Sequence, residues 1–206
     1  MQWLLIIYAS FATQGINYFF FNFAYLELVP LIECKYNEND DFVKCEDFKD
    51  ICVEGKVHEW KIDYTDPYSY HNWMTDQQLY CKSDFMIGLF GTLFFTGLGL
   101  MGLIMKLADK YGRKRMVTVG CLFQLTMVYG LMFSNDYRIY YGLLFFGGLS
   151  FSKDMLLYMY MQEVTVEKYQ VFVGSYKMTM HNTVCHIHIS LYFYFGGKDW
   201  RIGYAP

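Results

Sequence analysis

Three stretches of this chain contain no charged residue. They cover residues 1–26, 85–105 and 116–135. A helix needs about 20 apolar residues to cross the hydrocarbon core of a bilayer, and a helix inside lipid satisfies its own backbone hydrogen bonds. The pattern therefore predicts transmembrane helices over residues 3–26, 85–105 and 116–135.

Two later apolar stretches carry a few polar side chains. Residues 139–162 contain Lys153 and Asp154, and residues 171–195 contain Lys177 and three histidines. We expect a transmembrane helix in each, because ionisable groups inside such helices face a cavity or a neighbouring helix. The predicted fold class is an all-α membrane protein with about five transmembrane helices.

An acidic segment, residues 27–82, separates the first two predicted helices. It holds 13 acidic and 6 basic residues, and it contains four of the six cysteines: Cys34, Cys45, Cys52 and Cys81. The short segment 106–115 has five basic residues, a bias that marks the cytosolic side. By alternation, residues 27–82 form an extracellular loop, where disulfides persist. Four cysteines allow three pairings, and an unpaired acidic linker is the alternative.

The stretch 85–105 is rich in glycine. Small residues let transmembrane helices approach one another closely. Gly88, Gly91 and Gly97 therefore predict a tightly packed face on this helix.

Composition narrows the partners and the chemistry. The chain is 54% hydrophobic and only 18% charged, whereas about 25% charged residues is usual for a soluble domain. No basic run alternates with aromatic residues, so we expect a lipid bilayer and no nucleic acid as partner. The sequence offers no nucleophile–base arrangement, no phosphate-binding glycine loop and no zinc spacing. We therefore expect no enzyme activity, no cofactor and no metal.

Polar residues inside the predicted helices are candidates for a solute path. A charge at mid-membrane costs roughly 2.5–3.5 kcal/mol on insertion scales. Lys153 and Asp154 are adjacent, about 100° apart on a helix, so both can point to a common interior without bonding each other directly. A structural contact with a neighbouring helix is the alternative for this pair. The other candidate path residues are Asn17, Asn22 and Gln124.

The junction between the second and third predicted helices has a distinctive motif. Asp109 lies near the end of one helix, and Arg113 can turn back to it across Gly112. Such a pair could form and break as the cytosolic side closes and opens. The alternative is a cluster that only marks the cytosolic side, with a glycine for the turn.

This junction resembles the signature of the major facilitator superfamily, G-x-L-A-D-R/K-x-G-R-R/K. The matching residues are Leu107, Ala108, Asp109, Lys110, Gly112, Arg113 and Lys114, while Met105 stands in place of the leading glycine.

Within that superfamily the chain is similar to the organic cation, anion and carnitine transporters. Gln2-Trp3, the cysteine-bearing loop, the segment 76–81 that ends in Cys81, and Trp200-Arg201 occupy the places expected from that resemblance. Glu163 matches the first position of an E-x-x-P-x-x-x-R motif, whereas Val166 and Gln170 replace its Pro and Arg.

The resemblance implies the N-terminal half of a twelve-helix carrier, with a small organic solute bound between two halves by alternating access. It implies a gating role for the junction residues and Glu163, and a plasma membrane or internal membrane as location. The missing second half and Gln170 support a different function, a degenerate half-transporter that serves as a non-transporting structural or accessory subunit of a membrane complex.

Overall fold

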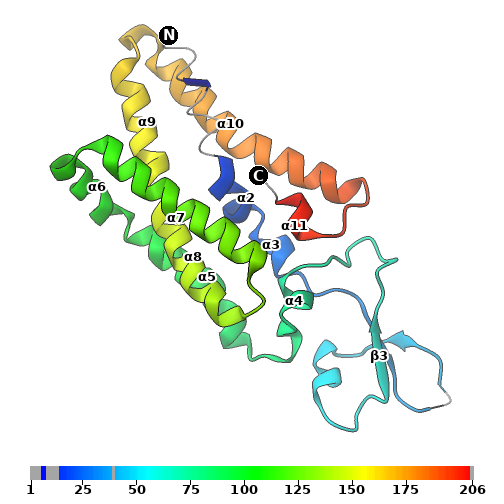
Figure 1. The fold of residues 1–206 in the computed structure, drawn as a ribbon. Helices are drawn as coiled ribbons and strands as arrows, with labels where there is room; N and C mark the ends of the chain where they lie inside the picture. The colour runs from blue at the N-terminus through cyan, green and yellow to red at the C-terminus, as the bar shows by residue number, and fades with distance from the viewer. Residues whose placement is uncertain (1–5, 8–13, 39, 205–206) are drawn as a thin grey trace.

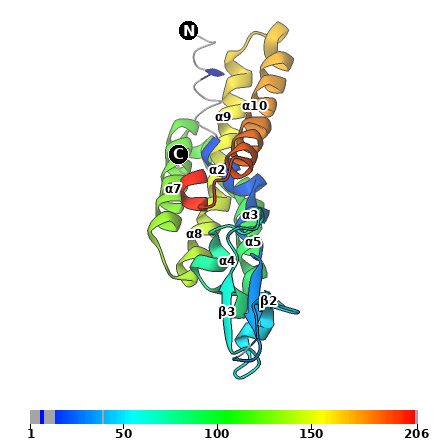
Figure 2. The same cartoon turned by 90° about the vertical axis from the view of Figure 1, so that its right-hand side faces the viewer.

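The computed structural model describes residues 6–7, 14–38 and 40–204. It is a helical body with a small sheet subdomain at one end (Figures 1 and 2). The longer helices are α2 (Gln14–Phe21), α5 (Asp84–Gly99), α6 (Met101–Tyr111), α7 (Arg113–Phe133), α8 (Tyr137–Ser150), α9 (Ser152–Val164) and α10 (Glu167–Tyr194). Three shorter helices have four residues each: α3 (Phe23–Leu26), α4 (Trp73–Asp76) and α11 (Trp200–Gly203).

The acidic segment 27–82 folds around a three-stranded antiparallel sheet of order β2-β1-β3. Its strands are β1 (Ile32–Lys35), β2 (Val43–Lys44) and β3 (Glu59–Ile62), and Cys34 of β1 pairs with Val43 on one side and Trp60 on the other. Two short 3-10 helices belong to the same segment: η1 (Phe48–Cys52) lies between β2 and β3, and η2 (Leu79–Cys81) follows α4.

Two disulfides staple this subdomain. One joins Cys34 to Cys45 and the other joins Cys52 to Cys81. The four loop cysteines are therefore all paired, and the structure selects one of the three pairings that the sequence left open. The second bridge ties η1 to the residues directly before α5 and so fixes the subdomain to the helical body.

The prediction of five transmembrane helices is wrong. In the described part of the chain, only Asp84–Tyr111 (α5 followed by α6) and Arg113–Phe133 are long and apolar enough to cross a membrane. The predicted helix 139–162 is divided at Phe151 into α8 and α9, of 14 and 13 residues. Lys153 and Asp154 lie beside this break and lower the hydropathy of the stretch, which is not among the candidate spans in the described part of the chain.

The other two predicted spans fail for different reasons. α10 is long, but Lys177, Asn182 and three histidines lower the hydropathy of the predicted span 171–195. The first span is interrupted at Asn22, which separates α2 from α3; residues 3–5 and 8–13 of that prediction lie outside the described residues. The sheet in residues 27–82 also makes the all-α class wrong.

Glycine positions the helices of the body against one another. α5 and α8 pack together where Gly97 meets Gly148. A Cβ atom at Gly97 would overlap the carbonyl oxygen of Phe145, and one at Gly148 would overlap that of Phe94. By contrast, Gly88 and Gly91 face open space. The predicted glycine face is therefore a contact at one of its three positions.

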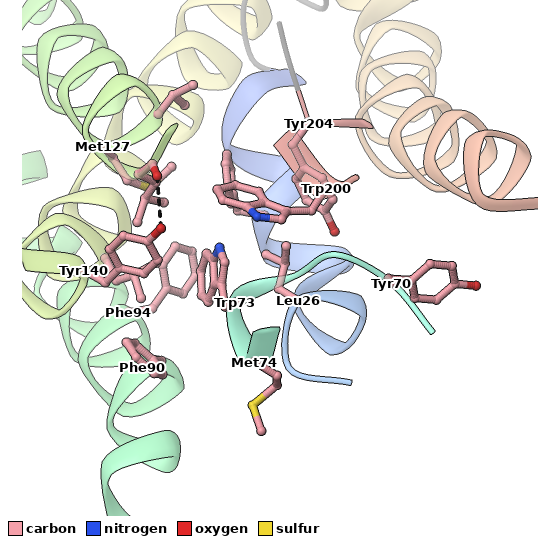
Figure 3. Close-up of a cluster of buried hydrophobic side chains, with 14 of the residues drawn as sticks. Leu26, Tyr70, Trp73, Met74, Phe90, Phe94, Met127, Tyr140, Trp200 and Tyr204 are labelled. Carbon is pink, nitrogen blue, oxygen red and sulfur yellow. Dashed lines mark hydrogen bonds between the residues drawn. The ribbon is translucent and has the colours of Figure 1, made fainter. Parts of the chain in front are cut away.

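An aromatic cluster joins the subdomain, the helices and the C-terminal segment (Figure 3). Trp73 of α4 is fully buried, and its ring centroid lies 5.3 Å from that of Tyr140 on α8 and 5.9 Å from that of Trp200 on α11. The Trp200 indole donates to Asp76 Oδ2 at 2.9 Å. Residues that are far apart in the sequence thus form one core at this end of the molecule.

Candidate functional site

A charged pair lies in the first turn of α9. Lys153 and Asp154 are 1% and 0% exposed, and Lys153 Nζ lies 2.6 Å from Asp154 Oδ1. Both side chains are buried, and contrary to the expectation they bond each other directly, because the long lysine side chain can turn toward its neighbour. Asp154 Oδ2 is also buried and has no hydrogen-bond partner within the described residues.

A second buried lysine approaches this pair from α10. Lys177 is 1% exposed, and its ammonium lies 5.8 Å from the centroid of the Tyr158 ring. Its charge interacts with Asp154 and with Lys153. No acceptor of a hydrogen bond from Lys177 is found in residues 6–7, 14–38 or 40–204. Lys153, Asp154 and Lys177 together form a buried cluster of two ammonium groups and one carboxylate.

Two features of the sequence build this cluster. Gly120 of α7 lies against Lys153, since a Cβ atom at position 120 would be only 2.7 Å from Lys153 Cβ. Ser150 and Ser152, on either side of Phe151, donate their hydroxyls to backbone carbonyls three residues earlier at 2.6 and 2.9 Å. The glycine leaves room for the lysine, and the serines bond the backbone on either side of Phe151, where α8 ends and α9 begins.

Gln124 is the predicted path residue that shares the helix face of Gly120. It follows Gly120 by four residues, and residues at that spacing lie on one face of a helix. Its Oε1 atom is buried and has no hydrogen-bond partner within the described ranges. The structure thus directs the amide of Gln124 toward the side of α7 that receives Lys153.

Asn17 and Asn22 occupy a different place. Both are buried, on α2 and at the break between α2 and α3. The carbonyl oxygen of Asn22 accepts a hydrogen bond of 2.8 Å from the Tyr204 hydroxyl. α2 packs along α10, and the Asn22 carbonyl joins the break between α2 and α3 to Tyr204, directly after α11.

An open cleft of about 530 Å³ separates parts of α9 and α10. Its walls include Tyr158 and Gln162 from α9 and Gly174 and Ser175 from α10. Tyr158 is also the ring over which the Lys177 ammonium lies. The open cleft and the buried cluster therefore share the Tyr158 side chain.

The predicted gating residues lie at the opposite end from the sheet subdomain. Gly112 adopts a φ of +92° between α6 and α7, a left-handed conformation that favours glycine. Arg113 forms an ion pair with Glu163 at the end of α9, and the guanidinium lowers the pKa of the Glu163 carboxyl. Asp109, the predicted partner of Arg113, acts on it only through its charge. Lys110 and Lys114 are exposed.

Sequence reasoning missed Lys177, Tyr158 and Gly120 as members of the site. Lys177 is the only charged residue in α10 after the first turn, so its isolation in a long helix was the available signal. The spacing of Tyr158 and Gly120 carries no comparable signal, because aromatic and glycine residues are frequent throughout this chain.

Comparison of the chain with protein-family models, with curated proteins and with solved structures gave no match.

Proposed function

We propose that this chain is a membrane-embedded carrier component that binds a small organic anion at the cluster of Lys153, Asp154 and Lys177. The observation that carries the proposal is the charge imbalance of the cluster. Two ammonium groups are at most 1% exposed, and a single carboxylate accompanies them. A bound carboxylate would neutralise the remaining positive charge.

The energetics favour a ligand at this place. A buried charge without a partner is expensive, and removing one partner of a buried pair typically costs about 3–5 kcal/mol. Lys153 already bonds Asp154, so Lys177 shares the charge of the same carboxylate and has a cation–π contact of 5.8 Å with Tyr158. An anion entering from the α9–α10 cleft would reach Lys177 beside the Tyr158 ring.

The surface of the helical body supports a membrane location. In the most apolar 18-residue windows of Asp84–Tyr111 and Arg113–Phe133, only 17% and 22% of the residues are buried. Phe85 is 75% exposed and Leu122 is 57% exposed. Large apolar surfaces of this kind are rare on soluble monomers, and lipid would cover them.

Movement between α7 and α9 offers a way to couple binding to access. Gly120 lies against Lys153, and the Arg113–Glu163 ion pair joins the same two helices at the end away from the sheet. A shift of α9 that opened the cluster would also break this exposed ion pair. Because exposed pairs contribute only about 0–1 kcal/mol, the pair can open at little cost.

Ligand-induced stabilisation tests the proposal. We expect succinate and benzoate, but not tetraethylammonium, to raise the melting temperature of the detergent-solubilised chain, because a ligand that binds only the folded state stabilises it. In Lys177→Met the shift should disappear. Lys168→Met, in the exposed first turn of the same helix, is the matched control. Equal anion-induced shifts in Lys177→Met and the wild type would refute the anion site.

One observation favours a second function, a non-transporting accessory subunit. At the α9–α10 turn, Gln170 Nε2 donates to the carbonyl oxygens of Gln162 at 3.1 Å and Thr165 at 3.3 Å, and Gln162 Nε2 donates back to the Gln170 carbonyl at 3.3 Å. These neutral hydrogen bonds hold the turn closed. Anion uptake into liposomes would support the carrier, whereas no uptake together with stable co-purification of other membrane subunits would support this alternative.

A further inference from the structure

A groove of about 300 Å³ lies between the first turns of α7 and the middle of α9. Its walls are largely apolar and include Val117 from α7 with Leu156, Leu157 and the ring of Tyr160 from α9. Arg113 and Lys114 border the same groove at the start of α7. The apolar groove thus ends at two basic side chains.

The basic end of the groove has an uncompensated charge. Arg113 is engaged by Glu163, but Lys114 is exposed and forms no ion pair with any residue that the structure describes. Lys110 and Arg115 are exposed on either side of it in the sequence, and Asp109 is the single acidic residue in segment 106–115. The first backbone amides of a helix add a partial positive charge, and no side chain caps α7 at Gly112.

The groove also continues onto the exposed apolar surface of α7. Thr118 lines the groove, and Leu122 and Leu125 follow it by four and seven residues, which places all three on one helix face. These leucines are 57% and 49% exposed. A molecule in the groove can therefore extend along an apolar stripe on one side and reach cations on the other.

We propose that this groove binds one anionic glycerophospholipid. The phosphate would lie at Lys114, and an acyl chain would lie on Val117, Leu156 and Leu157 and continue toward Leu122. Basic pockets beside membrane helices are suited to anionic headgroups. Charge complementarity selects the headgroup, and the apolar walls distinguish a lipid from a soluble phosphate. The proposal shares the membrane location with the proposed function but does not require anion transport.

Native mass spectrometry of the purified chain tests this binding. With an equimolar mixture of phosphatidylglycerol and phosphatidylcholine of identical chains, we expect the wild type to retain one phosphatidylglycerol. One basic side chain contributes about 1 kcal/mol to binding at an anionic membrane surface, so Lys114→Gln should weaken this retention about fivefold. Leu157→Trp, which fills the groove and keeps every charge, should reduce retention of the lipid as well.

Lys168→Gln removes an exposed lysine from the start of α10, outside the groove, and should leave the retention unchanged. Equal retention of the two lipids, or an equal loss in Lys114→Gln and Lys168→Gln, would overturn the proposal. Effective competition by glycerol phosphate, which has no acyl chains, would also overturn it in favour of a soluble phosphate.

The two proposals fail separately. Phosphatidylglycerol retention by Lys177→Met, in the absence of any anion-induced shift of the wild-type melting temperature, would support the lipid site and refute the anion site.

Discussion

Glycine at position 120 decides whether Lys153 can lie between α7 and α9. An added methyl group would meet Lys153 at Cβ, 2.7 Å away, and Cβ cannot move without the helix that carries it. Overpacking of this kind typically costs about 1–3 kcal/mol. We therefore expect Gly120→Ala to lower the melting temperature and to abolish the stabilisation by succinate.

The control for this substitution is Gly99→Ala, because nothing lies within 4 Å of a Cβ atom at position 99. Alanine is a better helix former than glycine, so Gly99→Ala should be neutral or slightly stabilising. Thermal unfolding followed by tryptophan fluorescence measures both variants. Equal stability of the two would show that α7 and α9 are not in close contact at Gly120.

The buried carboxyl of Glu27 should make the stability of the protein depend on pH. Burial raises the pKa of its carboxyl from 4.5 to about 7, and Oε1 is buried without a hydrogen bond in the described part of the chain. The pKa of Glu27 is higher in the folded than in the unfolded state. The contribution of this carboxyl to the free energy of unfolding is therefore complete below pH 4.5 and is lost as the pH rises through 7. We expect the melting temperature to fall by a few degrees over that range in the wild type.

Glu27→Gln has no ionisable group at this position and should remove that part of the decline. Melting curves at several pH values between 4.5 and 8 compare the two proteins. An identical pH profile for both would show that Glu27 is not buried enough to affect folding.

At the scale of the element, close approach of α5 and α8 depends on single glycines. Gly97→Ala should destabilise the protein by about 1–3 kcal/mol, since the new methyl group would overlap the Phe145 carbonyl in the backbone of α8. Gly91→Ala, on the same helix and in open space, should cause no loss. Denaturant unfolding of the two variants checks the difference, and comparable losses would mean that the whole glycine face is packed.

Hydropathy could predict the positions of the helical stretches but not how each divides. Residues 85–105 and 116–135 correspond to parts of α5, α6 and α7 because a run of apolar residues is strongly helical in any buried or lipid environment. The break at Phe151 is different. It depends on two serine hydroxyls that bond the backbone locally, and such bonds compete with a continuous helix without leaving a charge in the sequence.

The candidate site shows the same contrast between what the sequence could and could not predict. The sequence could identify Lys153 and Asp154, because adjacent charges in an apolar stretch are unusual. It could not identify Lys177 as their neighbour, since that contact depends on how α10 returns along α9. It also assigned Arg113 to Asp109, its nearest acid in the sequence, whereas packing of α7 against α9 brings Glu163 to it.

At the scale of the whole molecule, the C-terminal segment around Lys198 to Arg201 meets residues 71–76 through a few specific contacts. His71 donates its backbone amide to the Lys198 carbonyl at 2.7 Å, and Trp200 donates to the His71 carbonyl at 3.0 Å. Arg201 lies 3.3 Å from Asp76 and 3.4 Å from Asn135. The number of cysteines could predict a subdomain held by disulfides. The hydrogen bonds and ion pair between these distant segments could not be predicted, because no repeating pattern in the sequence marks them.

Trp200 is the residue on which this closure depends. It is fully buried and perpendicular to Trp73 at 5.9 Å, and replacing a buried tryptophan by alanine costs about 3–5 kcal/mol. Trp200→Ala should therefore release the segment around Lys198 from the subdomain, lower the melting temperature and accelerate tryptic cleavage at Lys198. Trp60→Ala is the control, because Trp60 lies on the edge strand β3, away from the C-terminal segment (Figure 1). It is 39% exposed, and its ring centroid lies 5.5 Å from that of Tyr80. If both variants were cleaved at Lys198 at the wild-type rate, the C-terminal segment would be held by its backbone hydrogen bonds to His71 and not by the aromatic core.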